Sequence, residues 1–326
     1  MHNQTSFSQF KGVSAMPTKV ASYRIPGACS LRPFFVGLAA VVVMATSAHA
    51  QIYVGDQGSA KIGEYDAATG AAINATLISG LSAPRGLAFQ GTNLLVASGN
   101  SVLQYNASTG ALINPTFISL TSPSGLLVSG SNLFISTANG GRVAEYNVNT
   151  GAAINTTFIT GLVSPVDLQI SGGNLFVTDQ AAGRVSLYNA TTGAAINASF
   201  ITLASPWGLA ISGNTLFVSQ GSGRVGTYDA TTGAVINANF ITGLNSPLGL
   251  AISGNNLFVA NFGSGTVGEY NATSGATINA SFITGLTNPV DIAIRPVPEP
   301  STFAIMLAGL LLVGLRYRQQ MPHPRA

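Results

Sequence analysis

The stretch SPLGLAISGNNLFVANFGSGTVGEYNATSGATINASFITGL, residues 246–286, is one copy of a unit that recurs through most of the 326-residue chain. A tyrosine followed by an Asn or Asp turn marks the same point in each copy. It recurs every 40 to 42 residues, at Tyr65, Tyr105, Tyr146, Tyr188, Tyr228 and Tyr270. Self-similarity at such a period indicates a repeat architecture for residues 51–295.

Each unit contains four short runs rich in Val, Ile, Phe, Tyr and Thr, which in the quoted copy cover residues 248–252, 256–260, 266–270 and 276–284. The runs have strand length and lack helical periodicity. Gly254 and the segment 271–275 (NATSG) supply turn residues between neighbouring runs. Four antiparallel strands in a unit of this length are typical of a propeller blade.

Counting strands predicts an all-β fold with six blades of four antiparallel strands. The motif that opens a first strand occurs at Pro84, Pro123, Pro165, Pro206, Pro247 and Pro289. The repeat region begins with a second strand at Ile52 and ends with a first strand at 289–294, so we expect the last blade to close in a 3+1 arrangement. Pro115 would then lie in an outermost strand, where proline is tolerated.

Two sets of large apolar side chains recur with the repeat and predict the core between the blades. Burial of a large apolar side chain contributes about 1.5–3 kcal/mol. The first set is Tyr53, Leu95, Phe134, Phe176, Phe217 and Phe258, and the second is Leu77, Phe117, Phe158, Phe200, Phe240 and Phe282.

Residues 1–50 have the features of an export signal. A polar segment with four basic residues precedes the apolar run 34–45, and Ala48-His49-Ala50 is a small-residue cleavage site, so we predict cleavage after Ala50. Met16 is an alternative start, and a retained membrane anchor is the alternative reading of the apolar run.

Cleavage after Ala50 would change the composition of the exported protein. It removes Cys29, the only cysteine, and the repeat region contains no histidine. Six Lys or Arg residues against ten Asp or Glu residues give the segment 51–299 a net charge of −4. Nucleic acid is therefore not an expected partner, and a cysteine or histidine site is excluded from the propeller.

The C-terminal segment 296–326 contains Val297-Pro298-Glu299-Pro300, the apolar run 301–315 and the basic residues Arg316 and Arg318. It resembles a PEP-CTERM sorting signal, in which a short transmembrane helix precedes a basic stop. The resemblance implies a Gram-negative bacterium that makes exopolysaccharide and an exosortase that removes the tail. The protein would be inserted transiently in the inner membrane through 301–315 and then released or held at the cell surface. A plain membrane anchor is the alternative.

The repeat itself is similar to NHL-type six-bladed propellers in the motifs PxGLAI, NLFV and RVxxY. Related families include lactonases and lyases that bind a divalent cation in the central channel. The sequence carries no motif that matches their catalytic residues, so a metal-dependent lactonase or lyase is the alternative to a non-catalytic protein.

Four carboxylates are candidate ligands for Ca²⁺ at the channel mouth, because the loops that carry them should emerge on one face. They are Asp56, Asp167, Asp179 and Asp291. The competing interpretation is that each carboxylate accepts hydrogen bonds from its own turn. Otherwise no cofactor is expected.

Positions that differ between repeats on the same face predict a ligand-binding surface, because a purely structural position should stay uniform around the ring. The predicted residues are Arg85, Asp167, Gln180, Trp207, Gln220, Asn261, Phe262 and Asp291. Trp207, the only tryptophan, suits sugar stacking or a protein contact. We therefore expect an exported, non-catalytic binding or scaffold module whose partner is extracellular polysaccharide or an envelope protein.

Overall fold

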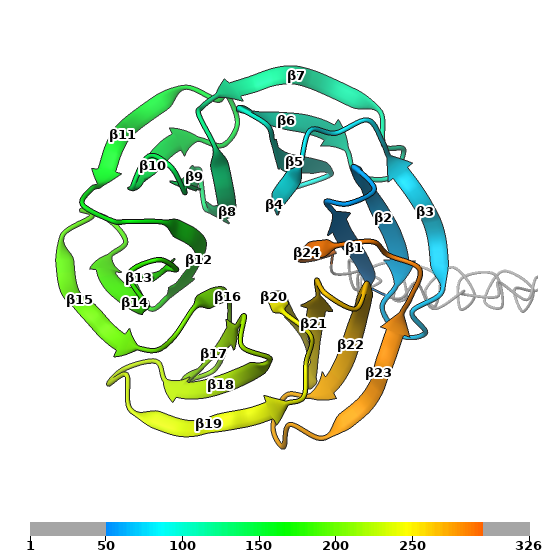
Figure 1. Ribbon diagram of the computed structural model, residues 1–326. Coiled ribbons are helices and arrows are strands. Elements are labelled where there is room, and N and C mark those ends of the chain that lie inside the picture. Colours follow the sequence, from blue (N-terminus) through cyan, green and yellow to red (C-terminus); the bar gives the residue numbers. More distant parts are fainter. Residues whose placement is uncertain (1–49, 296–326) are drawn as a thin grey trace, which may run out of the picture. The chain divides into compact units, whose positions relative to one another are not determined.

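The computed structural model describes residues 50–295, and these form six four-stranded antiparallel sheets arranged around a central channel (Figure 1). Blade 1 consists of β24 (Pro289–Arg295), β1 (Gln51–Asp56), β2 (Lys61–Asp66) and β3 (Ala72–Ile78). Blade 2 consists of β4 (Pro84–Gln90), β5 (Asn93–Ser98), β6 (Ser101–Asn106) and β7 (Leu112–Ser119). Blade 3 consists of β8 (Pro123–Ser129), β9 (Asn132–Thr137), β10 (Arg142–Asn147) and β11 (Ala153–Ile159).

The other three blades repeat this order from the channel outward. Blade 4 consists of β12 (Pro165–Ser171), β13 (Asn174–Asp179), β14 (Arg184–Asn189) and β15 (Ala195–Thr202). Blade 5 consists of β16 (Pro206–Ser212), β17 (Thr215–Gln220), β18 (Arg224–Asp229) and β19 (Val235–Thr242). Blade 6 consists of β20 (Pro247–Ser253), β21 (Asn256–Asn261), β22 (Thr266–Asn271) and β23 (Thr277–Ile283). The six-bladed all-β fold predicted from the repeats is confirmed, and Pro115 lies in the outermost strand β7 as expected.

Closure of the ring joins the two ends of the repeat region in blade 1. Strand β24 pairs antiparallel with β1 from Gln51 opposite Arg295 to Asp56 opposite Pro289, which confirms the predicted 3+1 arrangement. The buried carboxylate of Asp56 adds a clasp, because it accepts hydrogen bonds from the backbone N–H groups of Thr287 and Asn288 in the segment that leads into β24.

The core lies between neighbouring blades, where the two predicted sets of apolar side chains meet. All six members of the first set are at most 2% exposed. Aromatic pairs link the two sets within blades, such as Phe134 with Phe158 and Phe258 with Phe282, at centroid distances of 5.2 and 5.3 Å. The second set is buried in five blades, but Phe240 of blade 5 is only partly buried.

The Asn or Asp turn after each repeated tyrosine has the same construction in every blade. In blade 1, Asp66 accepts hydrogen bonds from the backbone N–H groups of Ala68 and Thr69. Gly70 ends this turn with φ near +70°, and a Cβ there would overlap the carbonyl oxygen of Phe282 in blade 6. Glycine is thus required both by the backbone conformation and by the close approach of the neighbouring blade.

Several predicted segments lie outside the described residues. These are the signal peptide within 1–49, the sorting motif at Val297, Pro298, Glu299 and Pro300, the short helix at 301–315, and the basic stop at Arg316 and Arg318. Within residues 50–295, no helix is long and apolar enough to cross a membrane.

Candidate functional site

The innermost strand of every blade begins at the same end of the channel, and there the six strands surround a cavity of about 410 Å³. The residue that follows the blade-opening proline lines this cavity in all six blades. These residues are Arg85, Ser124, Val166, Trp207, Leu248 and Val290. We call this cavity the mouth. Its lining therefore combines one cation, one hydroxyl, one indole and three aliphatic side chains, presented by equivalent positions of nearly identical strands.

The next residue of each innermost strand forms the floor of the mouth. It is glycine in four blades, and a Cβ at Gly86 or Gly208 would overlap the carbonyl oxygen of Ser124 or Leu248 in the next blade. In blades 1 and 4 the same position is Asp291 and Asp167. Strands β24 and β12, which carry these two residues, lie three blades apart in either direction, on opposite sides of the channel (Figure 1).

Each of these two aspartates bridges its own blade to the next one. Asp167 accepts the backbone N–H of Leu168 at 2.8 Å and that of Leu209 in blade 5 at 2.7 Å. Asp291 accepts the backbone N–H of Ile292 at 2.9 Å and that of Leu87 in blade 2 at 2.8 Å. Both oxygens of each carboxylate therefore already have a donor from the protein.

Burial raises the pKa of Asp167 to about 6, against the weaker lowering effect of the Leu209 and Leu168 amides. Burial also raises the pKa of Asp291 well above its usual range, and the negative charge of Asp167 raises it further. Desolvation favours the neutral form of a carboxylic acid, and a second carboxylate nearby has the same effect. The two groups thus change charge at higher pH than ordinary aspartates.

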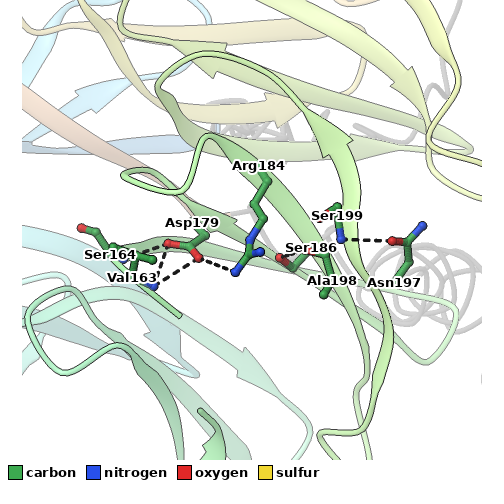
Figure 2. A network of polar contacts seen from close by, with 8 residues as sticks. All are labelled: Val163, Ser164, Asp179, Arg184, Ser186, Asn197, Ala198 and Ser199. Atoms are coloured by element: carbon green, nitrogen blue, oxygen red, sulfur yellow. Dashed lines mark hydrogen bonds and ion pairs between the residues drawn. The ribbon is translucent and has the colours of Figure 1, made fainter. Parts of the chain in front are cut away.

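Asp56 and Asp179 do not lie with Asp167 and Asp291 at the mouth. Both are completely buried at the ends of β1 and β13, and Asp179 accepts the backbone N–H groups of Val163 and Ser164 and pairs with Arg184 at 3.1 Å (Figure 2). Asp56 makes the equivalent bonds in blade 1. These carboxylates fix the loops that lead into β12 and β24.

The predicted cluster of four metal ligands is therefore not seen. Ca²⁺ takes six to eight oxygen ligands. Within residues 50–295, no group of three or more Asp, Glu, His or Cys side chains is placed to hold a metal ion. Asp167 and Asp291 alone, with both oxygens of each already bonded to backbone amides, do not fit such a site.

Trp207 is held at the mouth through its backbone. The Thr178 hydroxyl of blade 4 donates to the Trp207 carbonyl oxygen at 2.7 Å, and Ser219 donates in the same way to Leu248 in the next blade. The Trp207 side chain lies over Gly221, because a Cβ on that glycine would be 3.2 Å from the indole nitrogen. The indole is partly exposed and lines the mouth.

The structure separates the predicted binding residues into two groups. Arg85, Asp167, Gln180, Trp207, Phe262 and Asp291 all line the mouth. Gln220 and Asn261 do not, because both are buried at the ends of β17 and β21, and Gln220 accepts a hydrogen bond from Arg224. These two side chains are therefore not part of the surface of the mouth.

Sequence reasoning missed the backbone arrangement that leads into each innermost strand. The residue before the blade proline has a left-handed conformation in four blades, at Ala83, Ser122, Ser205 and Ser246, with φ between 48° and 51°. In blades 1 and 4 the preceding residues are Asn288 and Ser164, whose N–H groups bond to Asp56 and Asp179. A signal was present in the sequence, because the only two blades with Asp on the floor also have Asp at the end of the second strand.

Fold and site together define a six-bladed β-propeller with a non-repeating mouth. The model of the family described as outer membrane protein assembly factor BamB matches residues 56–281, and the chain belongs to this family. Residues 296–319 match the PEP-CTERM protein-sorting motif, which confirms the resemblance seen in the sequence. The protein is thus an exported propeller protein sorted to the cell envelope or surface. No curated protein matches its sequence.

Many solved structures resemble the propeller, and two of them illustrate the likeness. One chain of the nidogen/laminin complex superposes with a TM-score of 0.66 at 18% identity, covering 75% of this chain and 98% of that one. A gluconolactonase from Xanthomonas campestris superposes with a TM-score of 0.58 at 18% identity, covering 68% and 85%. At this identity the likeness shows the fold alone, and it fits the NHL-like propeller expected from the repeats.

Proposed function

We propose that this protein is a non-catalytic binding module that holds extracellular polysaccharide at the mouth of its propeller. It would be made by a Gram-negative bacterium, processed by an exosortase near Pro298-Glu299-Pro300 and left at the cell surface or released. The apolar run 301–315 would hold it in the inner membrane until that step. The sorting motif at residues 296–319 supports this route.

One observation carries the proposed ligand site. Six nearly identical strands place five different kinds of side chain, at the position after the blade proline, around one cavity. A volume of about 410 Å³ lies in the range of small-ligand sites, which is roughly 300–1,000 Å³. Packing needs no such variety at equivalent positions, so the variety is better explained by a ligand that meets each blade differently.

The chemistry of the lining favours a sugar chain over other ligands. Trp207 offers an aromatic surface for the C–H face of a sugar ring, and Ser124, Ser205 and Gln180 offer neutral hydrogen-bonding groups. Arg85 is exposed beside them and would attract an acidic sugar unit. An envelope protein, the other partner expected from the sequence, would need a wider contact than this cavity provides.

A catalytic role is not supported by the residues at the mouth. Residues 50–295 contain no histidine or cysteine, and the two carboxylates on the floor each hold two backbone amides. The lactonase alternative would need a metal site, and these residues offer no group of three or more Asp, Glu, His or Cys side chains placed to hold one. Binding without chemistry therefore accounts better for this arrangement.

We expect Trp207→Ala to weaken retention on the native exopolysaccharide about tenfold, because stacking of a sugar ring on an aromatic side chain contributes on the order of 1 kcal/mol or more. Affinity electrophoresis of the full chain in gels that contain this polysaccharide measures the effect. Ile154→Ala, which shortens an exposed side chain on the outer strand β11, is the matched control and should migrate like the wild type. Equal retention of both variants, or no retention of the wild type, would overturn the proposal.

A further inference from the structure

A second cavity, of about 500 Å³, lies between blades 5 and 6 at the end of the propeller opposite the mouth. It is bordered by the turn between β16 and β17, the turn between β22 and β23, and the outer strand β19. We call it the side pocket. It shares no lining residue with the mouth.

The side pocket exists because blade 5 lacks a pair of side chains found at the same place in other blades. In blade 6, the Asn256 amide donates to the Glu269 carboxylate at 2.7 Å, and in blade 3 Asn132 donates to Glu145 at 2.7 Å. The equivalent residues of blade 5 are Thr215 and Thr227, and both line the pocket. The Asn and Glu pair fills this space in blades 3 and 6. The two shorter threonines of blade 5 leave it open.

The missing pair also uncovers an aromatic ring. Phe240 packs edge-on against Phe217 with centroids 5.6 Å apart, whereas the equivalent pairs in blades 3, 4 and 6 are tilted. Its counterparts Phe117, Phe158, Phe200 and Phe282 are buried, whereas Phe240 is partly exposed and lines the side pocket. An exposed phenylalanine in an otherwise uniform core is costly in water, and a ligand that covers it would recover that cost.

The lining defines the kind of ligand. Phe240 and Ile236 supply apolar surface, and hydroxyl and amide groups surround them. None of the lining residues carries a charge. The polar ones are Ser212, Thr215, Thr227, Asn237, Asn255, Thr273 and Ser274. A neutral sugar ring complements this lining, because it carries C–H groups on its faces and hydroxyls at its edge.

We propose that the side pocket binds a neutral pyranose, as a site separate from the mouth. The Phe240 ring would cover one face of the sugar, while Thr215 and the neighbouring hydroxyl and amide groups of the lining exchange hydrogen bonds with its hydroxyls. A charged sugar would be disfavoured, because no lining residue could neutralise its charge. Such a site would give one propeller two contacts with polysaccharide, at opposite ends of the channel.

The test restores in blade 5 the pair that blades 3 and 6 already have. The full chain is immobilised on a surface plasmon resonance chip, and D-glucose, D-galactose, D-mannose and N-acetyl-D-glucosamine are passed over it at millimolar concentration. We expect at least one to bind the wild type, and the double variant T215N/T227E to bind it at least tenfold more weakly. Ile154→Ala, on the outer strand β11 and outside both cavities, should bind it like the wild type, and Trp207→Ala reports the part of the binding that belongs to the mouth.

The outcomes separate this site from the mouth. Thr227→Gln, which copies Gln104 of blade 2, serves as a second filled variant if T215N/T227E does not fold, and the melting temperature of each variant reports folding. Binding that persists in the filled variants, or the absence of binding by all four sugars, would overturn the proposal. Loss of binding in Trp207→Ala alone would place the neutral sugar at the mouth and overturn it equally.

Discussion

A chain that ends at Leu286 should fail to fold cooperatively, whereas a chain that ends at Arg295 should fold. The shorter chain lacks β24, which is the innermost strand of blade 1 and the only partner of one edge of β1. Its loss also removes the contacts of β24 with β4 and β20 in the neighbouring blades. The ring would then open at the one place where its ends are joined.

The expected loss is comparable to the whole stability of a domain. Each large apolar side chain removed from the core costs about 1.5–3 kcal/mol, and Ile292 is such a residue. Removing this segment also removes the complete ladder of hydrogen bonds made by the seven-residue strand β24 and the backbone amides that bond to the buried Asp56. Native domains are stable by only about 5–15 kcal/mol.

Urea unfolding followed by circular dichroism measures this prediction. The chain that ends at Arg295 should show one cooperative transition, and the chain that ends at Leu286 should show none and should be digested rapidly by protease. Similar cooperative transitions in both chains would mean that blade 1 does not need its fourth strand, which would contradict the closed ring.

Replacing both floor aspartates should change how stability depends on pH. In the folded state the pKa values of Asp167 and Asp291 lie above the ordinary value of 3.8, so the folded protein holds more protons than the unfolded chain between about pH 4 and pH 6. The stability that these groups contribute is present below pH 4 and is lost as the pH rises through their folded-state pKa values. For Asp167 alone, the rise to about 6 corresponds to about 3 kcal/mol.

The double variant D167N/D291N isolates this effect, because asparagine does not ionise. The free energy of unfolding from urea titrations at pH 4, 5, 6 and 7 should fall more steeply for the wild type than for the variant, by about 3 kcal/mol or more over this range. The buried Glu64, Glu145 and Glu269 are present in both proteins, so their contribution cancels. Parallel curves would show that the floor carboxylates are not desolvated as described.

Much of the propeller could be predicted because its sequence repeats. The spacing of tyrosines, the six blade prolines and the offset between the first and last strands were enough to predict six blades and the 3+1 closure. Repetition makes each strand assignment consistent with five others, so local ambiguity is averaged out. The face that carries Trp207 and Arg85 followed from the alternation of strand direction.

The parts that could not be predicted depend on contacts between different blades. Asp167 and Asp56 both lie on the same face of the propeller. Asp167 lines the mouth, whereas Asp56 accepts hydrogen bonds from backbone amides of the loop that leads into β24. That difference arises from their positions, because Asp167 is the third residue of the innermost strand β12, whereas Asp56 ends β1 beside the loop that leads into β24. The side pocket likewise arises because two threonines of blade 5 replace the longer Asn and Glu pair of blades 3 and 6, and a pattern of residue types does not show that gap.

Hydrogen exchange of the full chain, with and without its native exopolysaccharide, tests most directly whether ligand is held by the non-repeating residues at the mouth. We predict slower exchange at residues 85–87, 124–126, 166–168, 207–209, 248–250 and 290–292, where the innermost strands begin, and unchanged exchange in the outer strands β3, β7, β11, β15 and β23. Slower exchange along the outer strands with none at the mouth would contradict the proposed function.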